Sequence, residues 1–138
     1  MASATLGDAA IALLREPVVV HLATTDADGT PHVTPVWVAV EDSEVVVNTA
    51  DNRHKAHNLR RSPRVALSAA DPTDPYRVVA FQGTVLEVTD EDADAHIDRL
   101  AKKYLGVDAY PMRQPGERRV KVRIRPDRVL MQPAAGGS

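Results

Sequence analysis

The chain has 138 residues, no cysteine and a formal net charge of −2. Its length suits one domain with a single core, and without cysteine it offers no disulfide, thiolate nucleophile or Cys-based metal site. No apolar run approaches the roughly 20 residues of a membrane-spanning helix, and the N-terminus lacks the pattern of a signal peptide. We therefore expect a cytoplasmic protein without a membrane partner, and the slight net acidity argues against a general nucleic-acid binder.

The first half of the chain reads as a helix followed by short strands. The apolar pattern predicts a helix at 5–15, a strand at 18–25, a turn at 26–29, a return strand at 30–40 and a third strand at 44–49. Asp28-Gly29 supplies the positive φ that a tight hairpin requires. Because Pro31 and Pro35 lack backbone donors, the return strand should lie at a sheet edge or carry a bulge.

The second half continues the same alternation. A short basic helix should follow the third strand, then strands at 64–69 and 76–88, a helix from Thr89 to Gly106, and strands at 119–124 and 127–131. Gly83 inside the long strand predicts a bulge or bend. Six or seven strands with short turns favour a mainly β, antiparallel closed sheet or small barrel with a few flanking helices. One domain should span 1–132, with a disordered tail at 133–138.

The basic helix is the most informative segment. From Arg53 to Arg64 the chain has five Lys or Arg residues and no acid. Asp51 and Asn52 suit the N-cap position, and a helix beginning near Arg53 and Lys55 would point free N–H groups and two cations at one place. Such a place suits a phosphate or another dense anion, and a solvated surface helix is the alternative.

A second group of cations precedes and follows the start of the 119–124 strand: Arg118, Arg119, Lys121, Arg123 and Arg125. It reads either as a solvated strand face or as a site for a polyanion. His54 and His57 could share a helix face, but no other Cys or His cluster completes a metal site, so we expect no metal.

Three segments carry a family resemblance. Residues 20–32 hold VHLATT and DGTPH, residues 35–50 hold PVW and NTA, and residues 53–64 read RHKAHNLRRSPR. Together they resemble the split β-barrel flavin- and deazaflavin-dependent proteins of the pyridoxamine 5'-phosphate oxidase-like superfamily. The third segment is similar to the branch that uses coenzyme F420. The resemblance runs from about Ala10 to Met131.

The resemblance implies a homodimer that binds its cofactor in a groove between two subunits. It implies three groups of cofactor-binding residues: Thr34, Pro35, Val36 and Trp37 near the ring; Asn48 and Thr49 near the ribityl or ring part; and Arg53, Lys55 and Asn58 at the phosphate or the phosphoryl-linked tail. For Trp37, packing in the core or between subunits is an open alternative. Tyr76 and Tyr110 could reach the substrate or serve only in packing.

The function that the resemblance implies is hydride transfer from reduced coenzyme F420 to an unsaturated organic acceptor, a small molecule. FMN is the alternative cofactor, and a non-catalytic F420 carrier or a nucleic-acid binder are alternative functions. The second group of cations would then help to hold an oligoglutamate tail. Vitamin B6 oxidation is not expected, because the C-terminus lacks the longer substrate motif of the oxidases proper. No carboxylate pair or nucleophile elbow assigns a catalytic residue.

Overall fold

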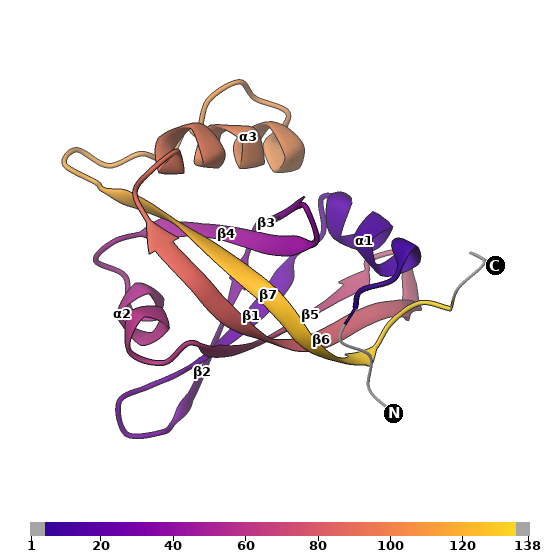
Figure 1. Cartoon of the computed structure of the whole chain (residues 1–138). Coiled ribbons are helices and arrows are strands. Elements are labelled where there is room, and N and C mark those ends of the chain that lie inside the picture. The colour runs from indigo at the N-terminus through magenta and orange to yellow at the C-terminus, as the bar shows by residue number, and fades with distance from the viewer. Residues whose placement is uncertain (1–4, 135–138) are drawn as a thin grey trace.

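The structure, a computed structural model, describes residues 5–134, which contain three helices and seven strands (Figure 1). The helices are α1 (Asp8–Arg15), α2 (His54–Arg61) and α3 (Ala93–Leu105). The strands are β1 (Val20–Thr25), β2 (Pro31–Val36), β3 (Val38–Glu41), β4 (Glu44–Ala50), β5 (Arg64–Asp71), β6 (Asp74–Thr89) and β7 (Arg119–Met131). None of these helices is long and apolar enough to span a bilayer.

The strands form one antiparallel sheet in the order β2-β1-β5-β6-β7-β4-β3. The two edge strands, β2 and β3, are consecutive in the chain and are separated only by Trp37. A sheet whose edges are joined by one residue must curl until those edges approach, and Figure 1 shows this curled half-barrel. The prediction of a mainly β fold with six or seven antiparallel strands is confirmed.

The core fills the inside of the curl. Alternate residues of the strands supply it, and fully buried side chains include Val20, Phe81 and Ile124. Helix α1 joins this core through Leu13 and Leu14, which are also fully buried. Valine dominates because the chain has few aromatic residues and because branched side chains pack well on a pleated surface.

The longest ladder pairs β6 with β7. It contains a register shift at Gly83, where the bend was predicted. A Cβ atom at Gly83 would lie 2.7 Å from the carbonyl oxygen of Arg125, so only glycine allows the two backbones to approach this closely. Two separate strands were predicted at 119–124 and 127–131, and this was wrong: they form the single strand β7, whose register shifts against β6.

The predicted return strand at 30–40 is also two strands. Trp37 interrupts it, and the N–H of Val38 donates to the hydroxyl of Tyr104 at 3.1 Å. The break therefore depends on a side chain that lies 66 residues further along the chain. Pro31 and Pro35 lie on β2, which is an edge strand as predicted.

Both predicted N-caps were wrong. Helix α2 begins after Arg53, whose extended backbone takes the N-cap position, while the Asp51 carboxylate binds Arg60. Helix α3 begins after Asp92, which adopts a left-handed conformation. Thr89 instead accepts the Glu91 N–H at 3.1 Å, in the turn before the helix.

Two further predictions concern the end of α3 and the end of the chain. Gly106 ends α3 in a left-handed conformation, as predicted. Of the predicted disordered tail, residues 135–138 lie outside the described part of the chain.

Candidate functional site

A cavity of about 250 Å³ lies where the β2–β3 junction, the end of β4, the start of α2 and the 110–112 loop meet. Its lining residues are Val19, Pro35, Val36, Trp37, Asn48, Thr49, Arg53, Lys55, Ile97, Tyr110, Met112 and Arg119. The structure thus brings together seven of the nine residues that the resemblance assigned to a cofactor. The two that it leaves outside the cavity lining are Thr34 and Asn58.

Lys55 is a largely buried residue whose ammonium group has no counter-charge within residues 5–134. Only 7% of the residue is exposed, and among residues 5–134 its ammonium group has no hydrogen-bond or carboxylate partner. Burial, reinforced by the charges of Arg53 and Arg119, lowers the pKa of Lys55 to about 8. A buried charge of this kind is costly unless something compensates it. This wall of the cavity is therefore suited to an anion.

The start of α2 adds to the positive character of this wall. Arg53 is exposed, and its side chain has no hydrogen-bond or ion-pair partner within the described residues. Its carbonyl accepts the amides of Ala56 and His57, which closes the first turn. The amides of His54 and Lys55 precede that turn and belong to the N–H groups that a helix start leaves without an intrahelical acceptor. Cations and helix amides therefore converge at one end of the cavity.

Arg119 is the third cation at the cavity, and Asn48 and Glu117 hold its guanidinium group in place. Its Nε donates to Asn48 Oδ1 at 2.8 Å, and its Nη1 lies 3.0 Å from Glu117 Oε1. The guanidinium also sits over the ring of Tyr110, 5.1 Å from the centroid. Because Glu117 balances the charge of Arg119, Arg53 and Lys55 provide the uncompensated charge of the cavity.

Other residues of the cavity lining are aromatic or apolar. Trp37 stacks on Tyr104 with a centroid distance of 5.1 Å and meets Tyr110 edge to face at 6.1 Å. The Tyr104 hydroxyl donates to the carbonyl of Val18 at 2.7 Å while it accepts the N–H of Val38. Helix α3 thereby fixes Trp37 at the break between β2 and β3. A flat ligand with one anionic end matches this combination of cations and aromatic rings.

Asn58, which the resemblance assigned to the phosphate or the phosphoryl-linked tail, makes three side-chain hydrogen bonds within the protein. Its Nδ2 donates to Thr24 Oγ1 at 3.0 Å and to Asp26 Oδ1 at 2.9 Å, and its Oδ1 accepts from Arg61 at 2.7 Å. With both ends of its amide used, Asn58 ties α2 to the end of β1. Thr34 is half-buried on β2, beside the cavity lining but not part of it.

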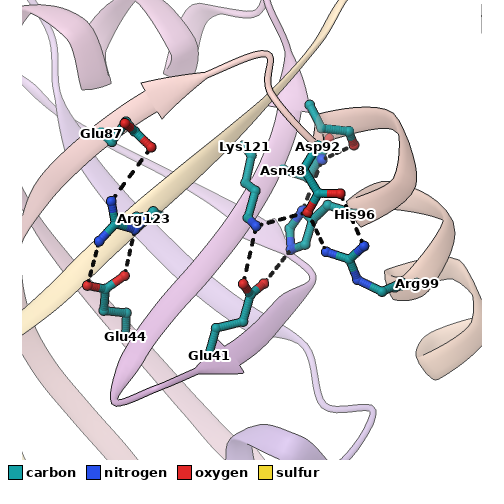
Figure 2. Close-up of polar contacts among 10 residues, drawn as sticks. Glu41, Glu44, Asn48, Glu87, Asp92, His96, Arg99, Lys121 and Arg123 are labelled. Carbon is teal, nitrogen blue, oxygen red and sulfur yellow. Dashed lines mark hydrogen bonds and ion pairs between the residues drawn. The ribbon is translucent and has the colours of Figure 1, made fainter.

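The second group of cations is neutralised by ion pairs. The pairs are Arg118 with Asp90 (2.8 Å), Arg119 with Glu117 (3.0 Å), Lys121 with Glu41 and Asp92 (3.2 Å each), Arg123 with Glu44 (2.7 Å) and Arg125 with Asp127 (2.8 Å). Figure 2 shows the pairs of Lys121 and Arg123. That this group helps to hold an oligoglutamate tail stays a prediction, and a tail carboxylate would have to displace the partner that each cation already has.

The histidines of α2 do not form a metal site in the described structure. His54 Nε2 lies 2.7 Å from Asp26 Oδ1 and ties the helix to the β1–β2 turn. Within residues 5–134 no three His, Cys, Asp or Glu side chains are grouped so as to hold a metal ion.

Sequence reasoning did not identify four of the lining residues. Val19, Ile97 and Met112 are apolar residues with no distinguishing pattern, so no sequence signal separates them from the core. Arg119 carried a signal, as a member of the second group of cations, but that signal did not show that it faces the cavity.

The chain is similar over nearly its whole length to known proteins. A family model described as pyridoxamine 5'-phosphate oxidase matches residues 6–132. A solved structure described as an F420 reductase is 29% identical, with a TM-score of 0.79 over 90% of this chain and 98% of that chain. A conserved hypothetical protein from Mycobacterium tuberculosis is 31% identical, with a TM-score of 0.72 over 97% of this chain and 94% of that chain.

These matches confirm the resemblance seen in residues 20–32, 35–50 and 53–64. The family match extends beyond those segments to both the helix α1 and the last strand β7. The chain belongs to the pyridoxamine 5'-phosphate oxidase family.

Proposed function

We propose that this protein is an oxidoreductase that binds coenzyme F420 in the cavity and reduces an unsaturated organic acceptor. The observation that carries the proposal is the largely buried, unpaired Lys55 beside Arg53, in one cavity with Trp37 and Tyr110. The similarity to a protein described as an F420 reductase supports the choice of coenzyme.

The residues present fit the chemical parts of this coenzyme. Arg53 and Lys55 would hold its phosphate-linked end, because a phosphate supplies the negative charge that Lys55 lacks. Asn48 and Thr49 would lie beside the middle of the molecule, and Pro35, Val36 and Trp37 would pack against the ring. Asn58 would act indirectly, by holding α2 in place.

When bound, the reduced deazaflavin supplies a hydride to an electron-poor C=C or C=N bond. The chain's own contribution is to orient and to shield. Trp37, fixed by Tyr104, would set the plane of the ring, and the apolar side chains of Ile97 and Met112 would limit water near it. A proton from solvent would complete the reduction, since the cavity is open to solvent beside Val19, which is about half exposed.

We further propose that two copies of the chain complete the site. Pockets that enclose drug-sized ligands occupy roughly 300–1,000 Å³, and the cavity of one protomer measures about 250 Å³. A coenzyme with a ring, a ribityl chain and a phosphate-linked tail would therefore extend beyond one protomer, and a second copy would cover the remainder.

The test is a parallel binding titration of F420 and FMN with the wild type, Lys55→Met and Lys102→Met. Lys102 is an exposed lysine on α3 and provides a matched control. Loss of a charge-assisted contact to phosphate should weaken binding roughly tenfold or more in Lys55→Met, and Lys102→Met should bind as the wild type does. Unchanged affinity in Lys55→Met would remove the anion-site assignment.

FMN is the second candidate, because it also combines a flat ring with a phosphate and the family description is that of an oxidase. A protein that is yellow as purified and prefers FMN in the titration would favour it. Binding of F420 without reduction of any acceptor in a broad panel would instead indicate a carrier. Salt-dependent duplex binding that is lost in Arg60→Ala plus Arg61→Ala would indicate a nucleic-acid binder.

A further inference from the structure

His96 is a buried histidine that touches the cavity wall from behind. It lies on α3 and is fully buried. Its Nδ1 is 3.1 Å from Asn48 Nδ2, and its Nε2 has no hydrogen-bond partner within residues 5–134 and lies 3.8 Å from Glu41 Oε2 (Figure 2).

The partners of Asn48 determine which nitrogen of His96 carries the proton. Asn48 Nδ2 donates to the carbonyl of Ala93 at 2.8 Å, and Asn48 Oδ1 accepts from Arg119 Nε at 2.8 Å. A carbonyl can only accept and a guanidinium can only donate, so the amide has one possible orientation. Its second N–H then points at His96, so Nδ1 must be the acceptor and the ring proton must lie on Nε2.

We propose that His96 is a positioning residue for the coenzyme site. Its unprotonated Nδ1 holds the Asn48 amide, and Asn48 Oδ1 in turn fixes the guanidinium of Arg119 at the cavity. The inference rests on the proposed function, since the cavity must receive the coenzyme for this chain of contacts to affect binding.

The surroundings of His96 keep its ring neutral. Burial is the main cause that lowers the pKa of His96 to about 4, and the charges of Lys121 and Arg99 act in the same direction. Asp92 opposes them, but its carboxylate is already bound to Arg99 and Lys121. The acceptor on Nδ1 is therefore available throughout the physiological pH range.

Two substitutions separate positioning from simple packing. Leucine nearly fills the space of the ring but leaves the Asn48 N–H without an acceptor. Asparagine leaves a void, yet its Oδ1 falls where His96 Nδ1 was, two bonds from Cβ, and can accept the same N–H. Packing alone predicts that His96→Leu is the better substitute, and positioning predicts that His96→Asn is.

The experiment measures F420 and FMN affinity and thermal stability for the wild type, His96→Leu and His96→Asn, below the melting temperature of each. We expect roughly tenfold weaker binding for His96→Leu and recovery to within about threefold of the wild type for His96→Asn. The order of affinities should hold even if His96→Leu melts higher. Equal affinities, or tighter binding by His96→Leu, would overturn the proposal.

A second measurement separates failure of this inference from failure of the proposed function. The Arg119 Nε–H resonance should be protected from exchange in the wild type and His96→Asn, and unprotected in His96→Leu, with no ligand present. If the wild type binds neither coenzyme, the proposed function fails while this resonance still tests the positioning. Protection that persists in His96→Leu would overturn the inference in every case.

Discussion

At the scale of single residues, the cavity holds a lysine that destabilises the ligand-free protein and that a bound anion would stabilise. Lys55 sits in the first turn of α2 with little exposure and two cations for neighbours. Stability alone would favour an apolar residue there, because an unpaired buried charge costs free energy. A bound phosphate would reverse this preference, which is the physical reason to connect Lys55 with function.

Lys55→Met should therefore stabilise the ligand-free protein. The pKa of Lys55 is about 8 in the folded state, against 10.5 for an ordinary lysine such as the unfolded chain exposes, so the folded protein binds this proton more weakly. The resulting loss of stability is complete below pH 8 and disappears as the pH rises to 10.5. At pH 7 we expect Lys55→Met to raise the free energy of unfolding by about 1–3 kcal/mol, measured by urea denaturation without coenzyme. A less stable Lys55→Met would show that the ammonium group has a stabilising partner.

His96 should make stability depend on pH in a different range. Its pKa is about 4 in the folded protein, against 6.5 for an ordinary histidine such as the unfolded chain exposes. Above pH 6.5 the ring is neutral in the folded and the unfolded protein, so its titration does not affect stability. As the pH falls from 6.5 towards 4, the free energy of unfolding decreases, because only the unfolded chain takes up the proton in that interval. The loss is on the order of 3 kcal/mol. Urea denaturation from pH 7 to 4 should show a steeper fall for the wild type than for His96→Leu, and parallel curves would contradict the depressed pKa.

For single residues, the sequence predicted the part of the site whose residues are close together in the chain. It did not predict the contacts between residues that are far apart in the chain. Arg53 and Lys55 are recognisable because their charge, a strand end and a helix start are adjacent in the chain. The contacts of Asn48 with His96 and Arg119 span 48 and 71 residues, and no local pattern encodes them. For the same reason, the carboxylate partners of Arg118 to Arg125 could not be foreseen.

At the scale of elements, helix α3 acts as a brace for the cavity. Tyr104 interrupts the edge of the sheet by binding Val18 and Val38. Lys103 donates to the carbonyls of Leu14 and Val38 at 2.6 Å each, which ties α3 to α1 and to β3. The strand break at Trp37 was not predictable, because the pattern of alternation continues through it and the cause lies on another element.

A second feature at the scale of elements is the crossing of β6 and β7 at Gly83, where the sequence correctly predicted a bend. Gly83→Ala would place a Cβ atom 2.7 Å from the Arg125 carbonyl and 2.9 Å from Ile124 Cγ2. Relief requires backbone movement, so we expect the free energy of unfolding to fall by about 2–3 kcal/mol in chemical denaturation.

Gly7→Ala is the matched control for this substitution. Its Cβ would meet only the end of the Gln132 side chain, at 3.2 Å. That side chain can move, so the change should have little effect. Equal stability of Gly83→Ala and the wild type would show that the crossing has room for a methyl group.

At the scale of the whole molecule, a protein with net charge −2 places two cations without counter-charge at one cavity. The carboxylates pair with cations along β7, while Arg53 and Lys55 have no such partners in residues 5–134. This separation would draw an anionic coenzyme to one place without making the whole surface attractive to polyanions. The slight net acidity of the chain predicted a surface that does not attract polyanions in general. Only the fold shows that Arg53 and Lys55 meet at one cavity.

The proposed dimer leads to the last prediction, which concerns the hairpin between β5 and β6. Tyr76, near the start of β6, is 91% exposed in the protomer, so its own chain leaves this large amphipathic side chain almost uncovered. Tyrosine is favoured at protein interfaces, so we expect this side chain to contact the second copy. Light scattering should give the wild type twice the 15.0-kDa chain mass.

Tyr76→Asp should shift that mass towards the monomer and weaken coenzyme binding in proportion, because each site would lose the part that its partner covers. The folded protomer should melt within a few degrees of the wild type, since the side chain makes little contact within it. Leu105→Asp, which places the same charge at a half-exposed apolar position on α3, should remain dimeric. A wild type that is monomeric yet binds coenzyme tightly would mean that one protomer encloses enough of the ligand by itself.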